Sequence, residues 1–217
     1  MLQDDGAQRW PLTFTSSERN MLKTFLIQKC SNVDGFAYRS NRNAYPFNHR
    51  EMPREVYEKI FTRELELFLT QYFGSSPVIY TTEIISVEAM SCQQEFHRDH
   101  GSGPRLAVCL AFTIDGSKIG TLYVPKSHII NQENDKVTKN TKIESAWWKN
   151  DGLLYDIFTL HAGCENKSKV DKNLRVFITF LSSSLSTDRE TESKLKKGIY
   201  FSTTFQESKW NWIDEKF

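Results

Sequence analysis

The chain has 217 residues, and its 39% hydrophobic and 13% aromatic content is enough to build the core of one domain. A formal net charge of +1 at pH 7 provides no broad electrostatic attraction for nucleic acid or for a membrane surface. No apolar run approaches the roughly 18 residues of a membrane span, and the first residues lack the basic and apolar regions of a signal peptide, so we expect a cytoplasmic protein.

Residues 1–76 are expected to be mainly helical. The pattern Thr15-x-x-Glu18 matches a capping box, and apolar residues follow it at helical spacing, which predicts a helix from about Thr15. Residues 31–53 are rich in asparagine and arginine and contain two prolines. This stretch is therefore predicted to be irregular.

A longer helix is predicted from about Pro53 to Tyr72. Pro53 suits a first helical position, and the residues that follow form one apolar stripe at helical spacing. Gly74 then provides the residue type that commonly ends a helix.

After Pro77 the chain becomes rich in β-branched and aromatic residues, which are typical of strands. Five such runs are separated by turn residues without a helical pattern between them: 78–90, 105–114, 120–125, 152–160 and 174–182. Short strands in this arrangement favour an antiparallel sandwich or barrel. We therefore expect one α+β domain over residues 1–217, with a β core at 77–183 and a polar C-terminal extension at 184–217.

The segment QEFHRDHG, residues 94–101, places His97 and Asp99 two positions apart. On an extended strand, residues i and i+2 face the same side, so one imidazole and one carboxylate can bind one metal ion. His161, directly after the run 152–160, is the candidate third ligand. Two histidines and one carboxylate on one face of a metal leave the other positions open, as iron(II) oxygenases require. Alone, however, H-x-D is a weak signal, because a histidine beside an aspartate is more often a surface hydrogen bond.

Arg175 lies 14 residues after His161, inside the apolar run 174–182. An inward-facing arginine there would be a buried cation, and buried cations need an anionic partner. The planar guanidinium group suits a carboxylate bound through two hydrogen bonds. An internal salt bridge, or an edge-strand arginine that faces water, is the alternative to a bound carboxylate ligand.

The order of H-x-D, a distal histidine and an arginine on the following strand resembles the 2-oxoglutarate oxygenase superfamily, and most its phytanoyl-CoA dioxygenase-like branch. AFTIDGSKIGTLYVPKSH, residues 111–128, is similar to the branch's Gly-opened strand and PGSH-like box, although Lys126 replaces the glycine. HAGCENKSKVDKNLR, residues 161–175, is similar to its His-x-Gly-x-x-Asn-x-Ser and Arg run, with a longer spacing to the arginine. The resemblance covers residues 78–182, about half of the chain.

The resemblance implies a double-stranded β-helix core, of jelly-roll or cupin-like form, with the N-terminal helices packed on it. It implies a dioxygenase that uses Fe(II), 2-oxoglutarate and O2, with ascorbate as a reductant, and that hydroxylates a small molecule with release of succinate and CO2. The residues implied are three metal ligands, one partner for the C5 carboxylate of 2-oxoglutarate and two candidate hydroxyl groups beside it: His97, Asp99 and His161; Arg175; and Thr121 and Thr179. Related halogenases lack the carboxylate ligand, so Asp99 favours hydroxylation, demethylation or desaturation over halogenation.

The other histidines and Cys164 are expected to lie outside the metal site. His100 adjoins the motif but would point to the opposite face of an extended strand. His128 ends the Pro-x-Ser-His box and is structural in the resembling enzymes, and His49 is predicted to face solvent. The four cysteines, none in a C-x-x-C pair, are predicted to be reduced thiols, and Cys164 to serve packing.

Two other functions fit the same residues. One is a catalytically silent binding protein of the same fold, which iron-dependent turnover of 2-oxoglutarate would distinguish from an enzyme. The other is a cupin-type metalloprotein, whose three histidines and one glutamate would have to come from positions with unfavourable spacing: Glu95, His97, His100 and His161.

The substrate class is open at this stage. The branch suggests a small molecule or lipid-like acid, and a protein side chain or a nucleobase is the alternative, although the near-neutral charge weakens a nucleic-acid target. Residues 129–150 are polar and lack periodicity, so they are predicted to be either a mobile lid or a long surface loop. Trp147 and Trp148 would then lie at the mouth of the site or pack beneath this loop. The sequence does not indicate an oligomeric state.

Overall fold

The computed structural model describes residues 2–32, 35–37, 41–99, 107–114, 120–129, 141–146, 151–185 and 203–204. His100, Trp147, Trp148, most of the expected lid and nearly all of the C-terminal extension lie outside these residues. The described chain combines helices with antiparallel sheets, as the sequence predicts. Within it, no helix has the length and apolar character needed to cross a membrane.

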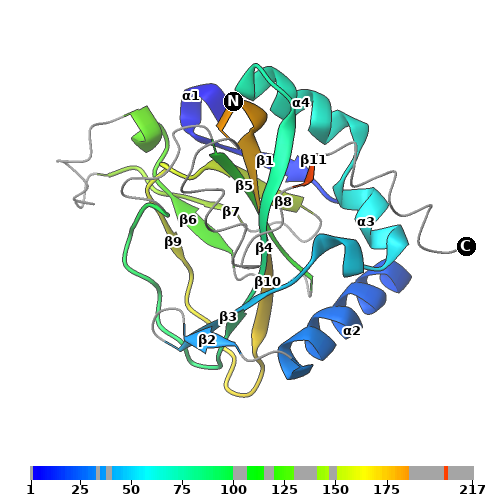
Figure 1. The fold of residues 1–217 in the computed structure, drawn as a ribbon. Helices are drawn as coiled ribbons and strands as arrows, with labels where there is room; N and C mark the ends of the chain where they lie inside the picture. Colours follow the sequence, from blue (N-terminus) through cyan, green and yellow to red (C-terminus); the bar gives the residue numbers. More distant parts are fainter. Residues whose placement is uncertain are drawn as a thin grey trace, which may run out of the picture.

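The strands form one large and one small antiparallel sheet (Figure 1). The large sheet has the order β1 (Ala7–Pro11), β8 (Asp151–Asp156), β5 (Ala107–Thr113), β10 (Asn173–Ser182), β4 (Pro77–Val87), β3 (Arg42–Pro46) and β2 (Phe36–Ala37), and β11 (Thr203–Thr204) also pairs with β4. The small sheet has the order β7 (Glu144–Ala146), β6 (Thr121–Tyr123) and β9 (His161–Gly163). The helices are α1 (Leu2–Asp5), α2 (Ser16–Asn32), α3 (Arg54–Ile60) and α4 (Arg63–Phe73). Figure 1 shows α2, α3 and α4 along one side of the large sheet and the small sheet on the other.

The central strand β10 separates an apolar core from a polar cavity. Val176, Ile178 and Phe180 are fully buried in the core that α2, α3 and α4 complete. The alternate residues Arg175 and Thr179 face the opposite side and line a cavity. Burial of each large apolar side chain contributes roughly 1.5–3 kcal/mol, so the period-two pattern of this strand is what fixes the polar residues toward the cavity.

The predicted capping box and helix stop are confirmed. The Thr15 hydroxyl accepts from the backbone N–H of Glu18 at 3.2 Å, and the Glu18 carboxylate accepts from the Thr15 N–H at 2.6 Å, directly before α2. Gly74 adopts the left-handed conformation, with φ of 69°, after the last residue of α4. This is the conformation in which glycine is favoured after a helix.

The single helix predicted from Pro53 to Tyr72 is wrong, because the chain forms two helices there. Phe61, with φ of −92° and ψ of 64°, interrupts the helical path. The Thr62 side chain then accepts a hydrogen bond from the Leu65 N–H at 3.2 Å and starts α4. A threonine cap satisfies an N–H group that a continuous helix would have bonded instead.

The expectation for residues 1–76 missed strands within them. β1 pairs with β8 at one edge of the large sheet, and β3 pairs with β4 inside the stretch predicted to be irregular. The sequence of β3, RNAYP, was not recognised as a strand. Arg42 faces the protein interior, at a position where an apolar residue would usually indicate a strand.

The prediction that His49 faces solvent is also wrong. Its side chain is 0% exposed, and its ring lies 6.3 Å from that of Tyr57 and 5.9 Å from that of Phe61. Neither ring nitrogen has a hydrogen-bond partner among the described residues. Burial, with a smaller contribution from the charge of Arg50, lowers the pKa of His49 from 6.5 to about 4.

Folding stability is therefore expected to fall as the pH decreases from about 6.5 to about 4. The unfolded chain takes up the His49 proton at the higher pH, so the stability this histidine contributes is complete above 6.5 and is lost as the pH falls through 4. The loss attributable to His49 is about 2–3 kcal/mol between pH 7.5 and pH 4.5. Urea unfolding at both pH values measures it, and His49→Phe should remove this part of the pH dependence. An identical pH dependence in the two proteins would show that the buried imidazole is not responsible.

Candidate metal centre

The segment that carries His97 and Asp99 lies against β9 and the end of β8. The backbone N–H of His97 donates to the carbonyl of His161 at 2.8 Å, and the N–H of His161 donates to the carbonyl of His97 at 2.9 Å. The Asp99 N–H donates to the Ile157 carbonyl at 3.2 Å. These bonds join two histidines that are far apart in the sequence.

The H-x-D segment is not the regular strand that the sequence suggested, since only His97 forms a β-bridge and Asp99 lies in a bend. The alternation nevertheless holds. Between the two residues, Arg98 turns away and its guanidinium donates to the carbonyls of Ser127 and Phe158. The backbone hydrogen bonds to β9 and to Ile157 therefore orient His97 and Asp99 toward the same side, as a regular strand would have done.

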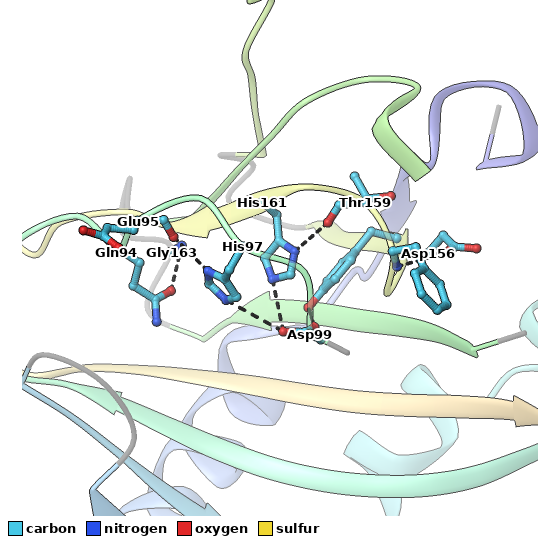
Figure 2. Close-up of polar contacts among 10 residues, drawn as sticks. Gln94, Glu95, His97, Asp99, Asp156, Thr159, His161 and Gly163 are labelled. Atoms are coloured by element: carbon cyan, nitrogen blue, oxygen red, sulfur yellow. Dashed lines mark hydrogen bonds and ion pairs between the residues drawn. The ribbon is translucent and has the colours of Figure 1, made fainter. Parts of the chain in front are cut away.

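The side chains of His97, Asp99 and His161 converge (Figure 2), with one ligand atom from each lying within 4.8 Å of the others. The Asp99 Oδ1 lies 3.8 Å from the His97 Nε2 and 3.4 Å from the His161 Nε2. This is the one such cluster of histidine, cysteine and acidic side chains found among the described residues. Its composition of two imidazoles and one carboxylate is the set the sequence predicted.

Both imidazoles are held in the form that binds metals. The Nδ1 of His97 lies 2.8 Å from the Glu95 carbonyl, and the Nδ1 of His161 lies 2.9 Å from the Thr159 carbonyl (Figure 2). Because a carbonyl only accepts, each Nδ1 carries the hydrogen, and in the neutral ring each Nε2 presents its lone pair. Two nitrogen lone pairs and a carboxylate oxygen that converge in this way fit a divalent cation.

Asp99 remains ionised at neutral pH. Burial raises its pKa, but the nearby His161 and His97, when charged, and a hydrogen bond from Tyr155 outweigh burial and hold the pKa at about 2. The Tyr155 hydroxyl donates to the Asp99 Oδ2 at 3.0 Å, which fixes the carboxylate with its Oδ1 toward the imidazoles. The side chain is 24% exposed, so it remains accessible from the cavity.

One cavity of about 280 Å³ connects this cluster with the remaining predicted site residues. Its lining includes all six of them: His97, Asp99, His161, Arg175, Thr121 and Thr179. Arg175 is only 3% exposed, and its guanidinium donates to the Asn173 Oδ1 and to the Cys164 carbonyl, each at 3.0 Å. The Arg175 guanidinium and the cluster of His97, Asp99 and His161 therefore line the same cavity. This arrangement suits an anionic ligand that binds the guanidinium and also reaches a metal ion.

A second buried arginine was missed by sequence reasoning. Arg42 of β3 is 2% exposed and lines the same cavity. Its Nη2 donates to the Cys92 carbonyl at 2.9 Å and to the Cys164 carbonyl at 3.1 Å. Arg42 and Arg175 therefore share one carbonyl acceptor and give the cavity two positive groups. No local signal in the sequence marks Arg42.

Gly163 allows the close packing beside Arg175. A Cβ atom there would lie 2.4 Å from the Gln94 Oε1 and 3.0 Å from the Arg175 Nη1. The Gly163 N–H donates to the Gln94 Oε1 at 2.8 Å (Figure 2). Gln94, which also lines the cavity, was not singled out in the sequence.

His128 and Cys164, which were expected outside the cluster, are not among its members, and His100 is not described. The His128 Nε2 lies 3.1 Å from the Gln3 carbonyl, and the Cys164 side chain is buried. Lys126 adopts a left-handed φ of 65°, so the residue that replaces the glycine of the PGSH-like box keeps a conformation that favours glycine. All four cysteines are free thiols, as predicted.

Comparison with known proteins gives structural likeness only. No family model matches the chain, and no curated protein matches it significantly in sequence. Among solved structures, the non-heme alpha ketoglutarate dependent epimerase SnoN from nogalamycin biosynthesis has a TM-score of 0.68 at 12% identity, over 84% of this chain and 78% of its own. A further SnoN structure is a complex with Fe3+, alpha ketoglutarate and nogalamycin RO.

Two further structures agree. The non-heme alpha ketoglutarate dependent carbocyclase SnoK from nogalamycin biosynthesis has a TM-score of 0.65 at 12% identity, over 84% of this chain and 81% of its own. AviO1 from Streptomyces viridochromogenes Tue57 has a TM-score of 0.62 at 16% identity, over 84% and 92%. At these identities the comparisons establish a shared fold.

Proposed function

We propose that the chain is a non-haem Fe(II)- and 2-oxoglutarate-dependent oxygenase with a jelly-roll core, which oxidises a small molecule. The observation that carries the proposal is the pair of imidazole Nε2 atoms directed at Asp99 in the cavity that also contains Arg175. The shared fold with SnoN and SnoK, two alpha ketoglutarate dependent enzymes, supports it. Membership of the phytanoyl-CoA dioxygenase-like branch is part of the proposal.

His97, Asp99 and His161 would hold the metal, and the Glu95 and Thr159 carbonyls would keep the two rings oriented. Bound iron would supply the activation of O2 that is coupled to conversion of 2-oxoglutarate into succinate and CO2. The chain's own residues would bind and orient the metal and 2-oxoglutarate, and they would exclude water from the cavity.

The cavity has positive charge for a dicarboxylate. Arg175 would bind the C5 carboxylate, because a buried guanidinium group gains most from a bidentate anion. Arg42, which bonds the same Cys164 carbonyl, adds a second positive charge nearby. Thr121 and Thr179, which line the cavity from β6 and β10, are proposed to donate a hydroxyl hydrogen bond to the diacid.

The reaction proposed is hydroxylation of a C–H group, with ascorbate as a reductant. The SnoN complex contains nogalamycin RO, which favours a small-molecule substrate over the alternatives of a protein side chain or a nucleobase. The epimerase and carbocyclase among the similar structures widen the set of oxidative outcomes to be tested. One domain over residues 1–217 and a cytoplasmic location remain part of the proposal.

The cluster also favours the oxygenase over a cupin-type site. A cupin-type site would need a glutamate ligand, and the group found among the described residues contains only Asp99 as its acid. Glu95 contributes its backbone carbonyl to the His97 ring. The composition therefore favours two histidines and one carboxylate.

Uncoupled turnover tests the proposal against a silent protein of the same fold. Purified protein is supplied with Fe(II), O2, ascorbate and 2-oxoglutarate without a further substrate, and succinate is measured by mass spectrometry. We expect slow succinate formation that stops when iron is omitted or replaced by Zn(II), which has no redox chemistry. Tight binding of 2-oxoglutarate without any succinate would favour the silent protein.

A further inference from the structure

A carboxylate outside the metal cluster faces the same cavity. Glu83 lies on β4, where the alternate residues Thr81, Glu83 and Ile85 line the cavity, while Ile84 is buried in the apolar core. Its side chain is half-buried. No hydrogen bond or ion pair in the described part of the chain engages the Glu83 carboxylate, although Asp99 acts on it electrostatically. Among the described residues, its negative charge therefore has no directly bonded cation.

This position is unfavourable for a charged group without a ligand. Burial raises the pKa of Glu83, and the negative charge of Asp99 raises it further. Both effects mean that ionised Glu83 destabilises the folded protein relative to an amide of the same shape. A binding site holds such groups because a ligand, when bound, offsets their cost.

Two aromatic residues line the same cavity as this carboxylate. Phe177 of β10 is directly opposite Glu83 in the strand register and also lines the cavity, and β4 and β10 lie side by side in Figure 1. Tyr80 adds a second ring to the lining. A carboxylate beside aromatic rings is the combination that binds an ammonium group, through charge and through cation–π attraction.

The remaining charges of the cavity have other partners under the proposed function. The two negative charges of 2-oxoglutarate would balance the positive charges of Arg175 and Arg42, and the metal ion would balance the negative charge of Asp99. Glu83 is then the negative group left for the substrate. Because the two arginines favour anions, a substrate cation would have to be oriented toward Glu83, which makes this residue a determinant of orientation as well as of affinity.

We propose that Glu83 binds a protonated amino group of the substrate, so that the oxidised small molecule is an amine. The identity of the cavity as an active site rests on the proposed function. The selection of a cation by Glu83 is tested separately.

The test compares benzylammonium with benzyl alcohol, two probes of nearly the same shape that differ in charge. Binding is measured by ligand-observed NMR on protein loaded with Zn(II) and 2-oxoglutarate, and again on metal-free protein. We expect wild-type protein to bind benzylammonium at least about tenfold more tightly, as one charge-assisted hydrogen bond provides. Glu83→Gln should abolish this preference, and Glu64→Gln, the same change on an exposed face of α4, should retain it.

A second readout separates binding from a structural role. Because Glu83→Gln removes an unfavourable charge, its melting temperature should equal or exceed that of wild type. Equal binding of the two probes by wild type, no binding of either, a cation preference that survives Glu83→Gln, or a lowered melting temperature would each overturn the proposal. Failure of 2-oxoglutarate to bind would instead count against the proposed function, since the comparison of wild type with Glu83→Gln on metal-free protein does not require 2-oxoglutarate.

Discussion

Asp99→Ala is expected to abolish succinate formation and to reduce iron affinity more than about 100-fold. Loss of a group that only orients a ligand typically costs 10–100-fold in metal affinity or activity, so loss of the ligand itself should exceed that range. Asp99 is the acidic member of the cluster, and without it the metal would be left with two neutral imidazoles. Retained iron is measured by elemental analysis after dialysis, and succinate by mass spectrometry.

Two further variants calibrate that result. Tyr155→Phe removes the hydroxyl that donates to the Asp99 Oδ2 at 3.0 Å and leaves the ligand itself in place, so a smaller loss of about 10-fold to 100-fold is expected. Asp4→Ala, an acidic-to-alanine change at an exposed position near the N-terminus, should leave both readouts unchanged. Full turnover by Asp99→Ala would refute the assignment of the metal ligands.

Arg175→Gln is expected to weaken 2-oxoglutarate binding at least about 30-fold while iron binding is retained. Removing one partner of a buried charged pair costs roughly 2–5 kcal/mol, because the other charge stays buried without compensation. Calorimetry under anaerobic conditions, on protein loaded with Fe(II), measures the 2-oxoglutarate affinity. Retained iron binding shows that the variant still folds around the metal.

Conservative and remote changes sharpen this prediction. Arg175→Lys keeps the charge but loses the planar fork and the bond to the Asn173 Oδ1, so its affinity should fall between those of wild type and Arg175→Gln. Arg54→Gln, at an exposed arginine paired with Glu58, should bind normally. If Arg175→Gln binds 2-oxoglutarate as well as wild type does, Arg175 does not bind the distal carboxylate, and the result favours the cupin-type alternative.

The parts of the fold that follow from local pattern were predictable. The β-branched and aromatic runs became β4, β5, β6, β8 and β10, since the residue types that favour strands are a local property of the sequence. The break at Phe61 and Thr62 was not, because a threonine inside an apolar stripe reads as helical until its side chain is seen to cap Leu65. Local propensity alone could not decide between one helix and two.

Some residues of the candidate site could be predicted from the sequence and others could not. His97, Asp99 and His161 could be proposed because their types and order are distinctive, whereas Arg42 could not. Its carbonyl partners at Cys92 and Cys164 lie 50 and 122 residues away, and only the assembled sheets bring them together. The prediction that His49 faces solvent failed for a related reason. Its burial depends on the rings of Tyr57 and Phe61, whose positions are set by the packing of α3.

A crystal structure grown anaerobically with Fe(II) and 2-oxoglutarate tests the central claim most directly. We expect one metal ion about 2 Å from the His97 Nε2, the His161 Nε2 and the Asp99 Oδ1, as imidazole and carboxylate ligands require. The same structure should show the distal carboxylate of 2-oxoglutarate on the Arg175 guanidinium. A metal bound elsewhere, or a diacid outside this cavity, would contradict the account.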